Sequence, residues 1–276
     1  MLAILSDIHG NLPALEAVIA DARAAGATGF VNLGDSLSGP LWPAETADLL
    51  MREAWPTIAG NHERQLLTHS LERMNASDRF ARGCLSDAHL AWLADQSEAL
   101  TVIPASLPGS TGRQAMRLSL DGIARGEVDP DTGAGMTDVG TILCVHGSPR
   151  SDVEHLIHSV EGIGLRDASD TEIETRLDGA SAPLIFCGHT HVARVVTLAD
   201  GRRIANPGSV GLQAYTDDHP AFYAVENGDP LARYALVSGT TVELCAIPYD
   251  HLSAAAKAER EGREDWAEAL RSGRNG

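Results

Sequence analysis

The sequence predicts an α/β fold, in which helices pack against a β-sheet. Over roughly the first 60 residues, apolar runs of strand length alternate with segments of helical periodicity, in the order strand, helix, strand, helix, strand. Of the 276 residues, 43% are hydrophobic and 21% are charged, a balance typical of a globular chain that buries a sizeable core. Because no linker divides the chain, we expect a single domain over 1–276.

The first five elements follow from local periodicity. Apolar runs of strand length cover 2–5, 30–33 and 57–59. Between these strands, apolar residues recur at helical spacing over 12–22, and a second helical pattern covers 43–53. This order predicts a sheet with helices packed on it.

The middle of the chain is expected to be helical first and extended later. A polar helical region covers 62–96, and we expect a helical cap at about 64–96, with an ordinary surface decoration as the equal alternative. Strand patterns follow over 101–120. The stretch 121–138 is rich in glycine and aspartate and indicates a loop.

The second half returns to short strands and ends in helices. A strand is expected over 141–145, a largely helical stretch over 152–178, and another strand over 184–187. From 192 to 247 the pattern indicates strands separated by turns, and the tail over 250–271 is helical. No internal repeat is present at any fixed period.

The charge of the chain restricts its partners. With 21 basic and 38 acidic residues the formal net charge is −17, which disfavours nucleic acid as a partner. A small phosphate ester needs only one local positive region, which metal ions can supply. We find no signal peptide, no run near the ~18 apolar residues of a membrane span, and no paired cysteine spacing, which predicts a cytoplasmic protein. The oligomeric state is not predicted.

Five short motifs each come directly after an apolar strand. They are Asp7-Ile8-His9, Gly34-Asp35, Gly60-Asn61-His62-Glu63, His146-Gly147 and Gly188-His189-Thr190-His191. In open α/β sheets, ligand sites form outside the carboxyl ends of the strands, so these loops are expected to converge on one crevice. In Asp-x-His and His-x-His, alternate residues of an extended segment share a face and can reach one cluster together.

The residue types in these motifs are those of a metal site. Carboxylates, imidazoles and an amide oxygen suit Mn, Fe, Zn or a similar divalent ion. No cysteine takes part, which argues against a closed structural zinc site. Each motif alone is weak evidence, but all five in this order predict one shared metal site.

The order of these motifs resembles the calcineurin-like metallophosphoesterase superfamily, whose pattern is D-x-H, G-D, G-N-H-E, H and G-H-x-H. The resemblance spans residues 1 to about 215. The segment over 206–211 also resembles the bacterial small-phosphodiesterase branch of that family. The resemblance implies a four-layer α/β/β/α sandwich of two mixed sheets, and an enzyme that is a metal-dependent phosphoric ester hydrolase.

The resemblance also implies a role for each matching residue. Two divalent ions (Mn, Fe, Zn or Ni) would be held by seven residues: Asp7, His9 and His191 for the first, Asn61, His146 and His189 for the second, and Asp35 as the bridge between them. His62 would face the leaving-group oxygen as general acid or hold the phosphate charge, and with Asp35 it forms the predicted catalytic pair. Asn61, His62 and Arg64 are predicted to contact the substrate, with a solvated surface role as the equal alternative for Arg64.

The chemistry implied by such a site is hydrolysis. Two cations about 3.5–4 Å apart clamp an in-line displacement, and a hydroxide that bridges them is the nucleophile. His62 titrates near neutrality unless perturbed, so it can deliver a proton at working pH. The metals supply the positive charge that the acidic chain lacks.

The predicted substrate is a phosphodiester or phosphomonoester of a small molecule, with nucleotides as one candidate class. A dinucleoside polyphosphate hydrolase and a protein phosphatase are alternatives, and a non-catalytic scaffold or a nuclease is disfavoured. Against the protein phosphatase, Ser38 stands where the phosphatase motif G-D-x-V-D-R-G has its second aspartate, and the arginine of that motif is absent. The residue that orients His62 is therefore left open.

The remaining polar residues near the motifs are given structural roles. Glu63 is expected to be a structural anion, and Tyr215 and His219 could rim the site. Six further histidines are expected on the surface or on helices: His69, His89, His155, His158, His219 and His251.

Overall fold

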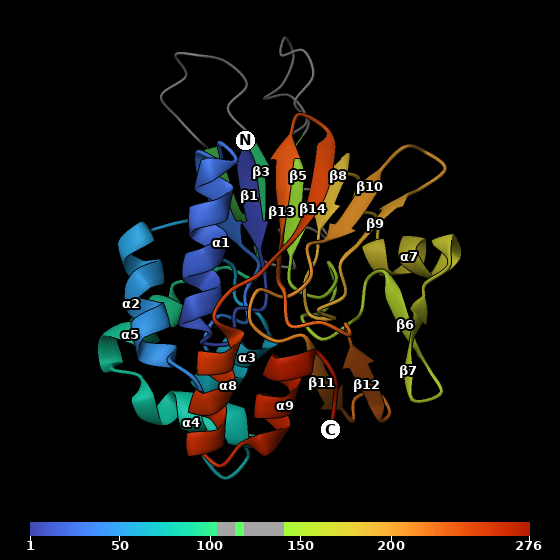
Figure 1. Cartoon of the computed structure of the whole chain (residues 1–276). Coiled ribbons are helices and arrows are strands. Elements are labelled where there is room, and N and C mark those ends of the chain that lie inside the picture. The colour runs from blue at the N-terminus through green and yellow to red at the C-terminus, as the bar shows by residue number, and fades with distance from the viewer. Residues whose placement is uncertain (104–113, 119–140) are drawn as a thin grey trace.

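The computed structural model describes residues 1–103, 114–118 and 141–276, and it contains two mixed β-sheets (Figure 1). The first sheet has the order β14-β13-β1-β2. Its strands are β1 (Leu2–Leu5), β2 (Gly29–Asn32), β13 (Ala232–Ser238) and β14 (Thr241–Ile247). β1 and β2 are parallel, whereas β13 runs antiparallel to both β1 and β14.

The second sheet has the order β4-β3-β5-β8-β10-β9. Its strands are β3 (Ala99–Ile103), β4 (Gln114–Leu118), β5 (Ile142–Val145), β8 (Leu184–Phe186), β9 (Arg194–Thr197) and β10 (Arg203–Asn206). The central strands β5, β8 and β10 are parallel, and the outer pairs are antiparallel. Parallel central strands bring their carboxyl ends to one edge of the sheet.

The two sheets pack face to face and bury a shared apolar layer. Ile4 and Val31 from the first sheet lie in one cluster with Cys144 and Phe186 from the second. Strands that are buried on both faces appear in the sequence as continuous apolar runs, which is why β1, β5 and β8 have no polar alternation.

Helices cover the outer faces of both sheets. α1 (Leu12–Ala24) and α2 (Pro43–Glu53) lie over the first sheet, where Leu15 packs in one cluster with Tyr234 of β13. α7 (Asp170–Leu177) lies over the second sheet through Ile173. Figure 1 shows α1 and α2 on one side and α7 on the other. The fold is therefore the expected four-layer α/β/β/α sandwich.

The remaining elements gather at the end of the sheets where the central parallel strands finish (Figure 1). Three helices fall in the region predicted to be helical over 62–96: α3 (Asn61–Thr68), α4 (Ala76–Cys84) and α5 (Asp87–Ala94). Two more close the chain: α8 (His251–Arg260) and α9 (Glu264–Ser272). A small hairpin of β11 (Ala214–Asp217) and β12 (Tyr223–Glu226) lies beside them.

The helical prediction over 152–178 is wrong for its first half. The chain there forms a hairpin of β6 (His158–Glu161) and β7 (Gly164–Asp167), and only then the single helix α7. The hairpin turns at Gly162, whose φ of 61° lies in the left-handed region that favours glycine. α7 begins after Ser169, whose hydroxyl accepts a hydrogen bond from the backbone N–H three residues on.

Two other predictions differ from the structure or lie outside it. The strand expected over 57–59 is reduced to two isolated bridges, Asn32 with Thr57 and Ile58 with Ser97. The strands expected over 101–120 correspond to β3 and β4, and the loop expected over 121–138 lies outside the described residues. Within the described ranges, no helix is long and apolar enough to cross a membrane.

The prediction that all six additional histidines lie on the surface or on helices is wrong for two of them. His155 is 7% exposed and His158 is 3% exposed, and neither lies on a helix. His158 Nδ1 lies 3.2 Å from the Thr190 hydroxyl, and its Nε2 is buried without a hydrogen-bond partner. Burial, followed by the nearby Arg194, lowers the pKa of His158 to about 4.

We expect His158 to make the fold sensitive to mild acid. The unfolded chain protonates this group near pH 6.5, but the folded chain resists protonation down to about pH 4. Stability is therefore complete above pH 6.5 and is lost as the pH falls towards 4, by about 2–4 kcal/mol from this group. Urea unfolding of wild type and His158→Gln at pH 7 and pH 4 measures the effect. Equal losses in the two proteins would rule His158 out.

Candidate metal centre

Backbone hydrogen bonds join the loops of the first and second motifs and the loops of the fourth and fifth motifs. The Asp7 N–H donates to the Gly34 carbonyl at 3.0 Å, and the His9 N–H donates to the Asp35 carbonyl at 3.0 Å. Gly188 donates to the His146 carbonyl at 2.7 Å. The His189 N–H also donates to Asp7 Oδ2 at 3.2 Å, which joins the two pairs. The loops after β1, β2, β5 and β8 therefore form one connected surface at the carboxyl ends of these strands.

Five of the predicted ligands have an unusual backbone conformation. They are non-glycine residues with positive φ: Asp7 (56°), His9 (53°), Asp35 (52°), His189 (67°) and His191 (60°). Each such residue costs on the order of 1–3 kcal/mol, and residues of this kind cluster at functional sites. The fold retains this conformation because the loops that carry them are cross-linked by the hydrogen bonds between motifs.

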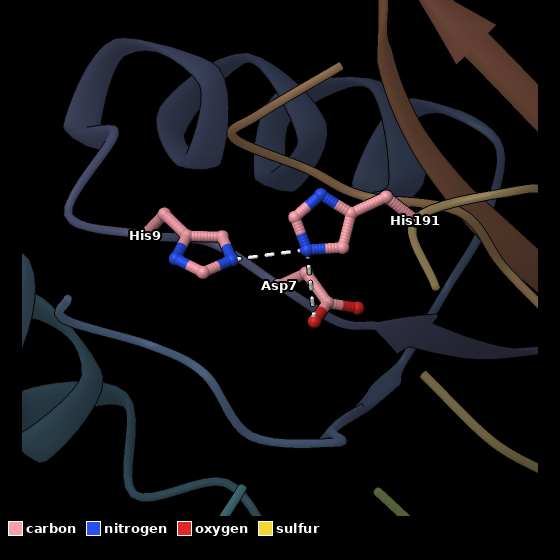
Figure 2. A group of neighbouring side chains, drawn as sticks. All are labelled: Asp7, His9 and His191. Carbon is pink, nitrogen blue, oxygen red and sulfur yellow. Dashed lines mark hydrogen bonds and ion pairs between the residues drawn. The ribbon is translucent and has the colours of Figure 1, made fainter. Parts of the chain in front are cut away.

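The first group of possible ligand atoms comprises Asp7, His9 and His191, which Figure 2 shows converging from two loops. Their ligand atoms lie within 4.8 Å of one another, and all three side chains are buried. His9 Nδ1 donates to the Ser38 carbonyl at 2.9 Å, and His191 Nδ1 donates to the Leu212 carbonyl at 2.7 Å. Both Nε2 atoms are therefore free to act as ligands, since such second hydrogen bonds determine the tautomer.

The contacts inside this first group fit a bound cation. The Nε2 atoms of His9 and His191 lie 3.1 Å apart, so that two possible ligand nitrogens face each other. Asp7 Oδ1 lies 3.4 Å from His191 Nε2 and has no hydrogen-bond partner although it is buried. Acceptors that face one another in a buried space are unfavourable unless a positive ion lies between them.

The second group comprises Asp35, His146 and His189, again within 4.8 Å of one another and buried. His146 Nδ1 donates to the Leu33 carbonyl at 2.8 Å, which turns Nε2 into the group. That nitrogen lies 3.0 Å from Asp35 Oδ2 and 3.2 Å from the Asn61 side-chain oxygen. One ring nitrogen and two oxygen acceptors thus converge, which is the arrangement of a second cation site.

The pKa shifts of these groups agree with this interpretation. Burial opposes ionisation of Asp7, but His191 outweighs it and lowers the pKa of Asp7 to about 2. Burial lowers the pKa of His9 to about 4 and that of His189 well below its usual value. Ionised carboxylates and neutral imidazoles are the protonation states that bind metals. His146 differs, because Asp35 overcomes burial and raises its pKa to about 10, so metal binding must displace a proton there.

The structure brings all seven predicted ligands together. Six of them make up the two groups, and Asn61 joins the second group through its contact with His146. Glu63 lies behind them, fully buried, and accepts three backbone N–H bonds of 2.8 Å from Asp35, Ser36 and Gly60. This carboxylate joins the loops of the second and third motifs, which is the structural role expected for it.

The residues predicted to contact the substrate or to rim the site lie in different surroundings from one another. His62 lies beside the first group, with its ring centre 5.5 Å from that of His9. Arg64 forms a bidentate ion pair with Asp152, at 2.6 and 3.1 Å, so its guanidinium is engaged by the loop after β5. Tyr215 packs its ring 4.6 Å from that of His191, which places it at the site as expected.

Two residues near the site were missed by the sequence analysis. Asp78 on α4 accepts a hydrogen bond from His62 Nδ1 at 2.7 Å. Trp266 on α9 lies edge-on to His9, with ring centres 6.0 Å apart. The only sequence signal for Asp78 is the Asn75-x-x-Asp78 spacing of a helix start, which does not indicate what the carboxylate contacts.

The model of one protein family, calcineurin-like phosphoesterase, matches residues 1–193. The chain belongs to this family. Members of the calcineurin-like phosphoesterase family are metal-dependent phosphoester hydrolases that typically bind two divalent ions, so this chain is a phosphoesterase of that class. No curated protein matches the sequence.

Solved structures share the fold of this phosphoesterase. A metallophosphoesterase from Sphaerobacter thermophilus is 24% identical with a TM-score of 0.65, and the match covers 99% of this chain and 98% of that one. A hypothetical protein from Pyrococcus horikoshii OT3 is 18% identical with a TM-score of 0.69, and the match covers 100% of both chains. The shared fold therefore extends past residue 193 to the C-terminal elements.

Proposed function

We propose that this phosphoesterase hydrolyses phosphodiester or phosphomonoester bonds of small molecules, nucleotides among them, with two divalent ions at the two groups. The observation that carries the proposal is an arrangement shared by three imidazoles. His9, His146 and His191 each donate Nδ1–H to a backbone carbonyl and turn a buried Nε2 towards another acceptor. Such fixed tautomers are typical of metal-binding histidines.

Three residues of the site have different proposed roles in this reaction. When bound, the two ions would supply the positive charge that attracts a phosphate ester and acidifies water. Asp35 belongs to the second group and is the proposed bridge to the first, while Asn61 would hold the second ion and contact the substrate. Asp35, followed by Asp78, overcomes burial and raises the pKa of His62 to about 10. His62 therefore holds a proton beside the first group and is placed to give it to the leaving-group oxygen.

The donor set suits Mn, Fe, Zn or Ni, and manganese is the ion that we would test first. Two local cation sites are compatible with a net charge of −17, because a small phosphate ester requires positive charge only where it binds. The four cysteines are free, which supports our proposal of a cytoplasmic location.

Reconstitution with metal tests the proposed function. Chelator-stripped protein should hydrolyse bis-p-nitrophenyl phosphate or p-nitrophenyl phosphate roughly 100-fold or more slowly than protein given back Mn²⁺, Ni²⁺ or Zn²⁺. The preferred ester separates a diesterase from a monoesterase, and products from diadenosine tetraphosphate test the dinucleoside alternative. Metal binding without turnover of any ester would instead support a scaffold.

A further inference from the structure

The loop that follows β2 leaves His62 without an orienting group. Ser38 stands at the position where a carboxylate would be expected, and its hydroxyl is buried with no hydrogen-bond partner. Its backbone carbonyl is already engaged by His9 Nδ1 at 2.9 Å. A histidine that transfers a proton needs its second nitrogen held, because the orientation and the tautomer of the ring both depend on that contact.

Asp78, in the first turn of α4, makes that contact. One carboxylate oxygen accepts from His62 Nδ1 at 2.7 Å, and Asp78 is only 1% exposed. The other oxygen accepts from the Asn75 side-chain amide at 3.0 Å, while the Asp78 N–H donates to the Asn75 side-chain oxygen at 2.8 Å. Both oxygens are therefore held, and the carboxylate has one orientation.

The contact determines which nitrogen of His62 is available for chemistry. A carboxylate only accepts hydrogen bonds, so Nδ1 must carry a hydrogen and Nε2 is the atom available to a substrate. The His62 ring lies edge-on to His9, beside the first group of ligand atoms. The contact with Asp78 thus holds Nε2 next to the place where a phosphate ester would bind.

α4 itself is held by the C-terminal helices, which lie beside it in Figure 1. Arg263, at the start of α9, donates to the Ser77 hydroxyl next to Asp78 at 2.9 Å. The guanidinium of Arg263 also lies 5.6 Å from the ring centre of Trp266, the residue that packs against His9. A second contact places the Lys257 ammonium 5.2 Å from the ring centre of Phe80 on α4.

We propose that Asp78 is the positioning residue of His62 and that α9 keeps Asp78 in place through the Arg263–Ser77 contact. The C-terminal helices are then part of the catalytic assembly, although they lie outside the residues that the family model matches. This inference rests on the proposed function, in which His62 delivers a proton to the leaving group.

The first experiment is Asp78→Asn, measured on two phosphate esters that differ only in their leaving group. With phenyl phosphate, kcat should fall roughly 10- to 1,000-fold with little change in KM, because phenolate needs the proton. With p-nitrophenyl phosphate the fall should be smaller, because p-nitrophenolate leaves without help. The metal content should stay equal to that of wild type. Equal losses on both esters, or no loss, would overturn the proposal.

Asp48→Asn is the matched control. Asp48 on α2 contacts His89 Nε2 on α5 at 3.1 Å. The substitution therefore removes another histidine–carboxylate contact of the same helical region. It should leave both kcat values unchanged. If Asp78→Asn fails to fold, Asn75→Asp keeps an oxygen that can cap α4 but removes the amide that holds the Asp78 carboxylate, and it should give the same leaving-group pattern at a smaller size.

The second experiment tests the tether. Arg263→Ala should lower kcat for phenyl phosphate roughly 3- to 10-fold, whereas Arg263→Lys should retain part of it because lysine can still donate to Ser77. Combined with Asp78→Asn, Arg263→Ala should add nothing, since both act through one carboxylate. Additive losses would refute the tether. Failure of the proposed function would appear differently, as a wild-type protein without metal-dependent turnover.

Discussion

Replacing Asp35 by asparagine should lower the metal-dependent hydrolysis rate by roughly 10³-fold or more and leave the fold intact. Asp35 is 2% exposed, and its two oxygens face different partners. Oδ1 accepts the backbone N–H of His62 at 2.9 Å, and Oδ2 lies 3.0 Å from His146 Nε2. An amide has nearly the same shape but lacks the negative charge, so it would hold cations far less well.

Metal analysis of the Asp35→Asn protein separates this cause from misfolding. The variant should bind fewer than two ions per chain while its circular dichroism matches that of wild type. Asp200→Asn is a suitable control, because Asp200 forms an exposed ion pair with Arg202 on the turn between β9 and β10. Full activity of Asp35→Asn with two bound ions would contradict the proposed bridge.

The sequence could predict which side chains converge at the candidate metal centre because each motif is encoded locally. An apolar strand followed by Asp-x-His or His-x-His specifies both the element and the residues at its end. The topology of the sandwich then brings the ends of β1, β2, β5 and β8 together. For the same reason α2 begins and ends at the predicted residues, since Pro43 suits the first turn and Ala54 ends the helix in a left-handed conformation.

The supports of the site could not be predicted, because they depend on packing between distant segments. Asp78 meets His62 only when α4 folds back over α3, and Trp266 meets His9 from the other end of the chain. The hairpin of β6 and β7 was missed for a local reason. Its turn depends on Gly162 at positive φ, and the periodicity on either side is too short to distinguish a strand from a helix.

Exchange of Glu63 for glutamine should destabilise the metal-free protein by about 2–4 kcal/mol. The carboxylate is completely buried and accepts backbone N–H groups from Asp35, Ser36 and Gly60, each at 2.8 Å. Glutamine replaces one acceptor oxygen with an NH₂ group that would point at these donors. At least one backbone N–H of the metal-binding loops would then be buried without a partner, which is a costly state.

Two opposing effects determine the size of this loss. Hydrogen bonds to a charged acceptor contribute about 1.5–3 kcal/mol each, which for three bonds exceeds the expected effect. Burial and the neighbouring Asp35 work in the other direction, because both raise the pKa of Glu63 and so disfavour its charge, although the backbone N–H groups lower it. The net loss should therefore lie well below the sum of the three bonds.

Urea unfolding of Glu63→Gln beside Glu172→Gln tests this balance. Glu172 occupies the equivalent position of α7 and accepts the Ser169 N–H at 2.8 Å, but its side chain is 30% exposed. Water can replace its lost contacts, so Glu172→Gln should cost less than Glu63→Gln. Because Glu63 holds the backbone of Asp35, the Glu63 variant should also bind metal more weakly. If both variants unfold at the same urea concentration, burial of Glu63 is not what makes its carboxylate important.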